Sequence, residues 1–229
     1  MLSLELVDVS VTFPGLAAPA LIIDRLTIPA GGRVAITGAS GSGKSTFVNV
    51  ATGLERPRQG AINWSGTDIA TLSEGRRDRW RGESVGLVMQ DFHLFAGLSA
   101  IDNILLPARL ARSASSEIVA RAHELLSRTG LKRPDQKIET MSRGEMQRVA
   151  VARALLRKPG VVIADEPTAS LDHESGEAVG SLLLQLAEEE QSTLIVVSHD
   201  PRLTDRLQRR ITFDLGRIVK DTALLEKAA

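Results

Sequence analysis

One run of nine residues, G-A-S-G-S-G-K-S-T at positions 38–46, constrains the fold of this chain more than any other feature. It fits the pattern G-x-x-x-x-G-K-[ST], in which glycines let the backbone curl around a phosphate while successive N–H groups point at the anion. The apolar run 33–37 before it predicts a strand, and residues 47–51 after it predict a helix that Gly53 ends. The sequence therefore predicts a phosphate-binding loop between a strand and a helix. The residues of this expected loop are Gly38, Ala39, Ser40, Gly41, Ser42, Gly43, Lys44, Ser45 and Thr46.

Two side chains of the loop have specific chemistry. We expect Lys44 to reach the β- and γ-phosphates of a nucleoside triphosphate, and the Ser45 hydroxyl to be a ligand of Mg²⁺. The alternative is a plain Gly/Ser-rich turn before a helix, which the flanking strand and helix patterns disfavour.

The composition fits a nucleotide-binding domain and excludes several other classes. The 229 residues are 43% hydrophobic, enough for one large domain or for one domain with a smaller lobe. Lys plus Arg and Asp plus Glu both number 28, so the net charge of +0 argues against nucleic acid or anionic lipid as a partner. The chain has no cysteine, hence no disulfides, and shows neither a membrane-spanning run nor a signal sequence. We expect a soluble, cytoplasmic protein.

The first part of the chain is rich in strand patterns. Residues 4–11, 20–28 and 60–64 are expected strands. The turn signals at 14–15 and 30–32 are interpreted as hairpin connections of an antiparallel sheet beside the nucleotide.

The middle and the end of the chain differ from this beginning. Residues 73–133 are expected to be helical, and the basic run 76–81 within them to be a solvated helix face. After residue 149, helical and apolar strand patterns alternate, with strands at 160–164 and 193–197, which indicates a parallel sheet with crossover helices. The clearest middle helix starts at Ser115 or Ser116, ends at Gly130, and has on one face Ile118, Val119, Ala122, Leu125 and Leu126.

Two of the apolar strands end in residues suited to hydrolysis. Asp165 and Glu166 follow one strand, and His199 follows the other, so the carboxyl edge of a parallel sheet would bring the three together. We expect Asp165 to hold Mg²⁺, Glu166 to orient or deprotonate the attacking water, and His199 to contact the γ-phosphate and steady Glu166. On their own, the two acids could equally be solvated residues at a strand end.

A fourth element completes a recognisable set. Residues 141–145, M-S-R-G-E, open a predicted helix that continues as M-Q-R-V-A-V-A-R-A-L. With the loop, the Asp-Glu strand end and the histidine in this order, the chain resembles the nucleotide-binding subunits of ATP-binding cassette (ABC) transporters over nearly its whole length. This resemblance implies an α/β P-loop NTPase core with a mostly parallel sheet, an antiparallel β subdomain and a helical subdomain that carries the signature. It implies one domain over 1–229, with the core and β subdomain at about 1–72 and 157–229 and the helical subdomain at about 73–156.

The resemblance also implies further site residues. Gln90 matches the catalytic glutamine that contacts Mg²⁺ and senses the γ-phosphate, and Asp172 matches the loop aspartate that crosses to the partner subunit. Phe13 stands where an aromatic ring stacks on adenine, although an ordinary strand-end core residue remains the alternative. The signature residues expected to contact the ATP of the opposite subunit are Ser142, Arg143, Gly144 and Glu145.

The sequence departs from the family pattern at two of these positions. Arg143 replaces the first glycine of the usual Ser-Gly-Gly, and Phe13 replaces the commoner tyrosine. A cation in the first turn of a helix is mildly disfavoured by the helix dipole. A nearby phosphate or acid would therefore offset Arg143, or its side chain would lie in solvent.

The family implies partners as well. Two copies are expected to sandwich two ATP with Mg²⁺ in a head-to-tail homodimer. A membrane subunit is expected to dock near residues 90–104, which holds the ATPase at the inner face of the membrane. The alternative for the apolar residues of this segment is packing in the core of the helical lobe. Residues 66–69, 98–107 and 163–168 resemble the lipoprotein-release and macrolide-efflux branch, in which the ATPase powers a separate membrane subunit.

Other functions fit less well. A soluble cassette ATPase of DNA repair or translation would need a long coiled coil or a second cassette, and a regulatory ATP-binding module should lack Glu166 or His199. A GTPase would need an Asn-Lys-x-Asp motif. The transported molecule and its direction of transport are not encoded in this chain.

Overall fold

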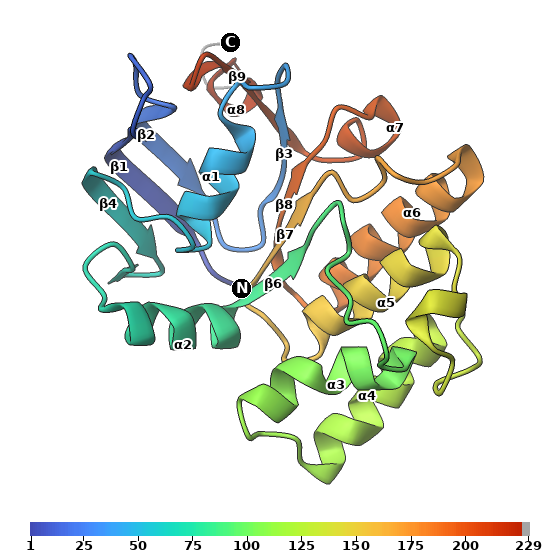
Figure 1. Ribbon diagram of the computed structural model, residues 1–229. Helices are drawn as coiled ribbons and strands as arrows, with labels where there is room; N and C mark the ends of the chain where they lie inside the picture. Colours follow the sequence, from blue (N-terminus) through green and yellow to red (C-terminus); the bar gives the residue numbers. More distant parts are fainter. Residues whose placement is uncertain (226–229) are drawn as a thin grey trace.

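The computed structural model describes residues 1–225, and two β-sheets organise them (Figure 1). The smaller sheet is antiparallel with strand order β2-β1-β4-β5. It forms from alternating apolar residues whose inward side chains are buried. Its strands are β1 (Leu4–Val11), β2 (Leu21–Ile28), β4 (Gln59–Trp64) and β5 (Thr67–Asp68).

The larger sheet has the order β10-β9-β3-β8-β7-β6, and all of its pairs are parallel except β10 with β9. Its central strands are almost entirely apolar because both of their faces are buried. The predicted α/β fold with a mostly parallel sheet and an antiparallel β sheet is confirmed. The strands are β3 (Arg33–Thr37), β6 (Val85–Val88), β7 (Val161–Asp165), β8 (Thr193–Val197), β9 (Arg209–Asp214) and β10 (Arg217–Asp221).

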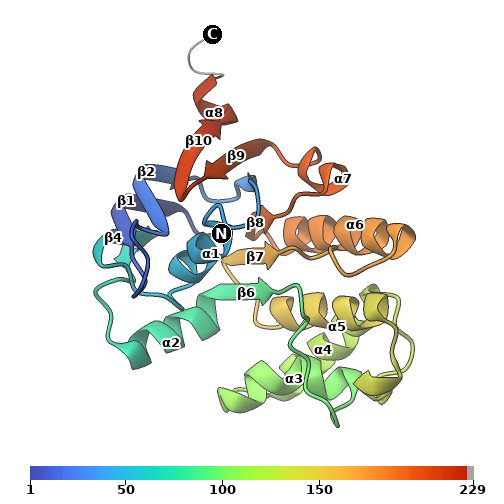
Figure 2. The same cartoon turned by 45° about the horizontal axis from the view of Figure 1, so that its top comes forward.

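Helices fill the space around the larger sheet (Figure 2). They are α1 (Lys44–Ala51), α2 (Glu74–Ser84), α3 (Ala100–Leu110), α4 (Ser116–Arg128), α5 (Arg143–Leu155), α6 (His173–Glu189), α7 (Pro201–Thr204) and α8 (Thr222–Leu225), with a 3₁₀ turn at Ile138–Thr140. Within residues 1–225, no helix is both long enough and apolar enough to cross a bilayer.

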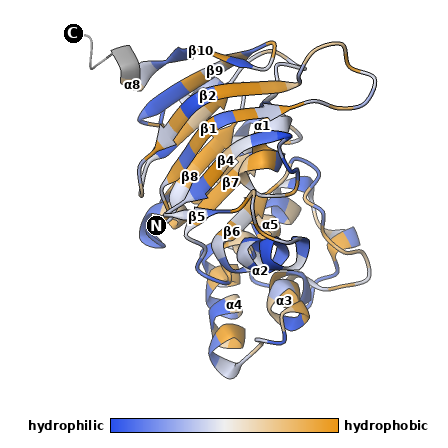
Figure 3. Cartoon of the chain, turned by 90° about the vertical axis from the view of Figure 1, so that its left-hand side faces the viewer, coloured by the Kyte–Doolittle hydropathy of each residue, from blue (hydrophilic) through white to orange (hydrophobic). Residues whose placement is uncertain are grey.

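The two faces of the larger sheet belong to different hydrophobic cores. Val161 and Ile163 of β7 pack with α1 and the antiparallel sheet, whereas Val162 and Ala164 pack with α3, α4, α5 and α6. The strands of both sheets are the most hydrophobic part of the chain in Figure 3, while α2 is mainly hydrophilic. This arrangement holds the carboxyl ends of the central strands in one place, where they border the phosphate loop.

Two expectations about the elements are wrong. The range 73–133 is not wholly helical, because β6 pairs with β7 in the larger sheet. The turn at 30–32 is not a hairpin connection, since it joins β2 in one sheet to β3 in the other. Two strands, β9 and β10, were not expected from the sequence: β9 pairs with β3, and β10 pairs with β9 at the edge of the larger sheet.

Two helices of the middle region show what local patterns predict. Ser115 caps α4 by accepting from the Ile118 N–H, and Ala122, Leu125 and Leu126 are buried as expected, but Val119 is 37% exposed. Helix α2 has no fully buried residue, which agrees with a solvated basic face. Its Trp80 nevertheless packs against Trp64 of β4, with ring centroids 6.1 Å apart. The division into subdomains at about residues 73 and 156 stays a prediction.

Candidate nucleotide site

The phosphate loop runs from the end of β3 to the start of α1, and two of its glycines, Gly38 and Gly43, are closely surrounded by other backbone. Gly38 has φ 144°, and a Cβ there would lie 2.3 Å from the carbonyl oxygen of Phe213 in β9. Gly43 has φ 100° and is the N-cap of α1, and a Cβ there would lie 2.9 Å from the carbonyl oxygen of Ala20. The backbone of β9 and of Ala20, directly before β2, therefore limits the curve of the loop from outside.

The start of α1 is open to an anion. Its N-cap Gly43 offers no side-chain cap, and its first turn has no acidic residue. The first N–H groups of a helix lack partners within the helix, and the helix dipole adds positive potential there. The Lys44 ammonium bends back and donates to the carbonyl oxygens of Gly38 and Ala39, both at 2.8 Å. The cation is thus held inside the curve of the loop, next to these N–H groups.

Asp165 at the end of β7 lies beside this loop, where its carboxylate interacts with Lys44 and Ser45. Burial raises its pKa above the ordinary value of 3.8, and the neighbouring charge of Glu166 raises it further. The charge of Lys44 and a hydrogen bond from the Ser45 hydroxyl act in the opposite direction. A partly buried carboxylate beside a hydroxyl is a set of hard oxygen ligands, which fits Mg²⁺. A bound Mg²⁺ would supply positive charge to the phosphates, and Asp165 and Ser45 would hold it.

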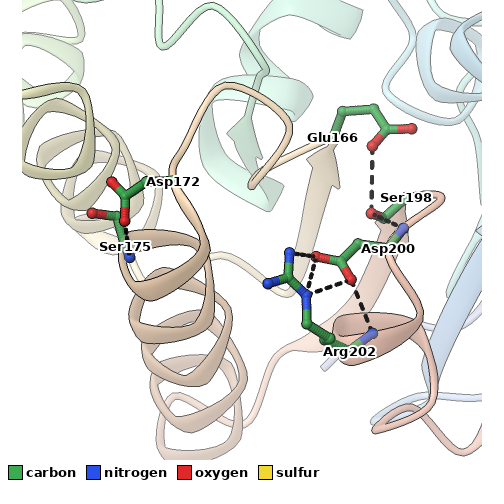
Figure 4. Close-up of polar contacts among 6 residues, drawn as sticks. All are labelled: Glu166, Asp172, Ser175, Ser198, Asp200 and Arg202. Carbon is green, nitrogen blue, oxygen red and sulfur yellow. Dashed lines mark hydrogen bonds and ion pairs between the residues drawn. The ribbon is translucent and has the colours of Figure 1, made fainter.

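Glu166 and His199 meet at the same edge of the sheet. The Nδ1 atom of His199 lies 3.0 Å from Oε1 of Glu166. The Ser198 hydroxyl donates to Oε2 of Glu166 at 3.4 Å, and Figure 4 shows these two side chains facing each other. The Glu166 side chain is only 16% exposed, whereas His199 is 73% exposed. The buried Ser198 hydroxyl thus orients the Glu166 carboxylate, while the exposed imidazole of His199 remains accessible to a ligand.

The backbone of Glu166 is unusual. Its φ is 46°, and its N–H donates to the carbonyl oxygen of Val197 in β8 at 2.8 Å. Left-handed backbone in a non-glycine residue is strained and persists only where its surroundings enforce it. The neighbouring strand therefore sets the direction in which the Glu166 carboxylate leaves the sheet.

The signature residues form the start of α5. The Ser142 hydroxyl accepts from the Glu145 N–H at 3.2 Å, and the Glu145 carboxylate accepts from the Ser142 N–H at 2.9 Å, which is a reciprocal capping box. Ser142 and Arg143 are exposed, while Gly144 is buried. A Cβ on Gly144 would lie 3.1 Å from the Ser175 hydroxyl of α6.

Asp172 is brought close to this helix start. Its carboxylate caps α6 by accepting from the Ser175 N–H at 2.9 Å, as Figure 4 shows. Because Ser175 packs on Gly144, the Asp172 loop and the signature helix lie side by side at their N-termini. Both sequence-derived elements are thus exposed at one face of the molecule.

The remaining predicted residues are less constrained. Gln90 is exposed in the turn after β6. Phe13 is half-buried at the end of β1 and packs against the core between the two sheets, which fits the alternative of a strand-end core residue as well as stacking on adenine. Among residues 1–225, no hydrogen bond joins Gln90 or Phe13 to Lys44 or Glu166. The roles expected for Gln90 and Phe13 therefore stay predictions.

Sequence reasoning missed several residues that support the site. Ser198 is completely buried and orients Glu166, and Gln147 of α5 donates to the carbonyl oxygen of Pro167, directly after Glu166, at 2.8 Å. Arg153 of α5 donates to two carbonyl oxygens of the segment after Gln90. Their positions within the motifs were visible, but their partners lie about 20 to 60 residues away and only the fold brings them together.

A glycine loop between a strand and a helix, with carboxylates at the end of a neighbouring parallel strand, defines the class of P-loop nucleotide hydrolases. The family model described as ABC transporter matches residues 23–169. The chain belongs to the ABC transporter family and is an ATPase subunit of the ATP-binding cassette type.

Individual relatives agree with this assignment. The chain is 38% identical to the lipoprotein-releasing system ATP-binding protein LolD of Pseudomonas syringae pv. tomato, over 86% of this chain and 87% of that protein. It is 40% identical to the macrolide export ATP-binding/permease protein MacB of Salmonella typhi, over 98% of this chain but only 35% of that protein. The dimeric, post-hydrolysis structure of the ATP-binding cassette MJ0796 with ADP and Pi matches with a TM-score of 0.87 and 34% identity, over 95% of this chain and 97% of that chain.

Proposed function

We propose that two copies of this chain bind two ATP with Mg²⁺ at their shared interface, and that closure of this dimer drives a membrane subunit of the lipoprotein-release or macrolide-export type. Each ATP would lie between the phosphate loop of one copy and Ser142 of the other. The dimeric cassette structure and the names of the relatives support this assembly. The protein would then lie at the cytoplasmic face of the membrane, attached through its partner.

The observation that carries the hydrolytic part is the pair of Glu166 and His199 beside the phosphate loop. A carboxylate held by Ser198 and by the imidazole can accept a proton from a water that attacks the γ-phosphate. His199 is exposed enough to donate to the γ-phosphate at the same time. Loss of the γ-phosphate would then remove the group that joins the two copies.

The docking of the membrane subunit is supported by the surface after Gln90. Phe95 is 55% exposed, and Leu98 is partly exposed, whereas Leu94 packs against the helical core. The apolar residues of this segment are therefore divided between core packing and the surface. An exposed aromatic ring is a suitable anchor for an apolar helix of a partner.

The substitution Glu166→Gln tests the proposed reaction. We expect ATP binding to remain, because the phosphate loop is unchanged, and the steady-state ATPase rate to fall by about 10²–10⁴-fold, the usual contribution of a general base. The variant should accumulate as a closed dimer when ATP and Mg²⁺ are added, which size-exclusion chromatography would detect. The exposed Glu83 of α2 provides the control substitution Glu83→Gln, which should hydrolyse ATP at the wild-type rate. Hydrolysis near the wild-type rate in Glu166→Gln would show that another group accepts the proton.

A further inference from the structure

Two arginines of α5 hold Phe92, which stands two positions after Gln90. The Arg143 guanidinium carbon lies 5.3 Å from the centroid of the Phe92 ring. Arg153 donates to the carbonyl oxygens of Phe92 at 2.7 Å and of His93 at 2.6 Å. The segment that follows Gln90 is therefore attached to the signature helix by both a side chain and two backbone groups.

This segment is strained where it is held. Phe92 and His93 have φ values of 59° and 45°, so two successive non-glycine residues adopt the left-handed conformation. The His93 N–H donates to the carbonyl oxygen of Asp91 at 2.5 Å, which makes the kink tight. Such strain persists only when surrounding contacts enforce it, and it is common in segments that switch. Phe92 is only 6% exposed despite its place in a connecting segment, and the contacts from Arg143 and Arg153 of α5 are made at the kink itself.

Arg143 is the residue of this group that the family pattern does not explain. A glycine at this position could make no contact with Phe92, and a cation in the first turn of a helix is electrostatically disfavoured. The negative face of an aromatic ring attracts a guanidinium and offsets that cost. The acidic side chain of Glu145 in the same turn contributes in the same direction.

We propose that Arg143 is a positioning residue that couples the Gln90 segment to the start of the signature helix. The proposal rests on the proposed function, in which Gln90 contacts the γ-phosphate of its own site and Ser142 contacts that of the partner. Because Phe92 stands two positions after Gln90 and Arg143 directly follows Ser142, the contact joins the two expected sensors through three residues, Asp91, Phe92 and Arg143. Contact of Gln90 with the ATP of its own site would then favour the conformation in which Ser142 contacts the ATP of the partner's site.

The test is a double-mutant cycle in the full chain. We expect Arg143→Gly to raise the ATP concentration at half-maximal ATPase rate by about three- to tenfold, within the range measured for cation–π contacts, and to lower the Hill coefficient for ATP. Phe92→Leu keeps an apolar side chain but removes the aromatic face, so it should have the same effects. The double variant should be no worse than either single variant, because each removes the same contact. Arg143→Lys keeps the cation and should restore most of the cooperativity, whereas Arg143→Gln should not.

Controls separate coupling from stability. Arg76→Gly places the same exchange in the first turn of α2, at an exposed arginine, and should leave the ATP dependence unchanged. Thermal unfolding of every variant shows whether the fold is retained, and if Phe92→Leu does not fold, the comparison of Arg143→Lys with Arg143→Gln decides. Effects of Arg143→Gly and Phe92→Leu that add independently would overturn the proposal, because Arg143 would then act on another group such as the nucleotide. An unchanged ATP dependence in Arg143→Gly would overturn it as well, while a wild-type protein without ATPase activity would refute the proposed function instead.

Discussion

The starts of α1 and α5 are both exposed helix N-termini with a glycine in or beside the first turn, yet they satisfy their backbone N–H groups in opposite ways. Gly43 leaves the start of α1 without a side-chain cap or an acid in the first turn. At the start of α5, Ser142 and Glu145 form a complete capping box. The first terminus leaves its donors without a side-chain cap, whereas the second satisfies the Glu145 N–H with the Ser142 hydroxyl. A triphosphate would therefore bind mainly to the first and be contacted by the second through its exposed side chains.

The pKa shifts of Asp165, near the start of α1, and of Glu145, at the start of α5, also differ in direction. Burial and the charge of Glu166 raise the pKa of Asp165 beside α1. At α5, the hydrogen bond from the Ser142 N–H lowers the pKa of Glu145. The charged form of Asp165 is thus disfavoured beside the phosphate loop, whereas the charged form of Glu145 is favoured at the start of the signature helix. A bound cation would offset the cost of the charged Asp165 carboxylate, whereas hydrogen bonds of the capping box offset it at Glu145.

The largest expected effect on ATP binding comes from Lys44→Ala, which removes the cation inside the phosphate loop. We expect ATPase activity to fall by about 10²–10³-fold, as when one donor to a developing negative charge is removed, and ATP binding to weaken strongly. ATP titration by calorimetry and steady-state ATPase assays measure both. The exposed Lys132 provides the matched control Lys132→Ala, which should behave as wild type. If Lys44→Ala retained tight ATP binding, the contrast between the two helix starts would not explain where the triphosphate binds.

The substitution Asp165→Asn should have opposite effects on activity and on stability. The folded-state pKa of Asp165 is raised, so its contribution to stability is fully present below the ordinary value of 3.8 and is lost as the pH rises through the folded-state pKa. Asparagine has no charge to bury, so the midpoint of thermal unfolding at pH 7 should rise by a few degrees without nucleotide. A gain of 1 kcal/mol corresponds to about 2–4 °C for a domain of this size.

Activity and pH complete this test. Mg²⁺-dependent ATPase activity of Asp165→Asn should be nearly lost, since a carboxylate ligand is removed. Thermal unfolding at pH values from 7 down to 3.8 should show the stability advantage of the variant becoming smaller as the pH falls through the raised folded-state pKa of Asp165. A lower midpoint than wild type at pH 7 would mean that Asp165 stabilises the fold, contrary to the comparison.

The smallest expected effect is the loss of folding stability caused by Ser142→Ala. The cap of α5 is lost, which costs about 0.5–2 kcal/mol. ATP-dependent dimerisation, measured in the Glu166→Gln background, should weaken at the same time. Ser142→Thr keeps a capping hydroxyl and should recover the stability. If Ser142→Ala lowered stability but left dimerisation unchanged, Ser142 would be a cap only, and the exposed side chains of this helix would not contact the partner's ATP.

Residues close together in the sequence were predicted well. The pattern around Lys44 predicted the strand, the loop and the start of α1, because the steric demand for glycine and the strand-to-helix transition are local. The buried strands before Asp165 and His199 were predicted from their unbroken apolar runs. By contrast, β6 was missed, since four residues between a helix and a turn give too short a pattern. Strands β9 and β10 were missed because polar and charged residues interrupt their alternation.

The sequence by itself determined the class of chemistry: a phosphate loop, the acids after β7 and the histidine after β8 each follow from short patterns whose geometry is set by neighbouring residues. Only the tertiary structure decided how these parts are oriented and connected. It placed Nδ1 of His199 3.0 Å from Oε1 of Glu166 and the Arg143 guanidinium against the Phe92 ring. It also showed Val119 to be exposed. The physical reason is that these contacts join residues distant along the chain, and their geometry depends on sheet order and helix packing, which no local pattern encodes.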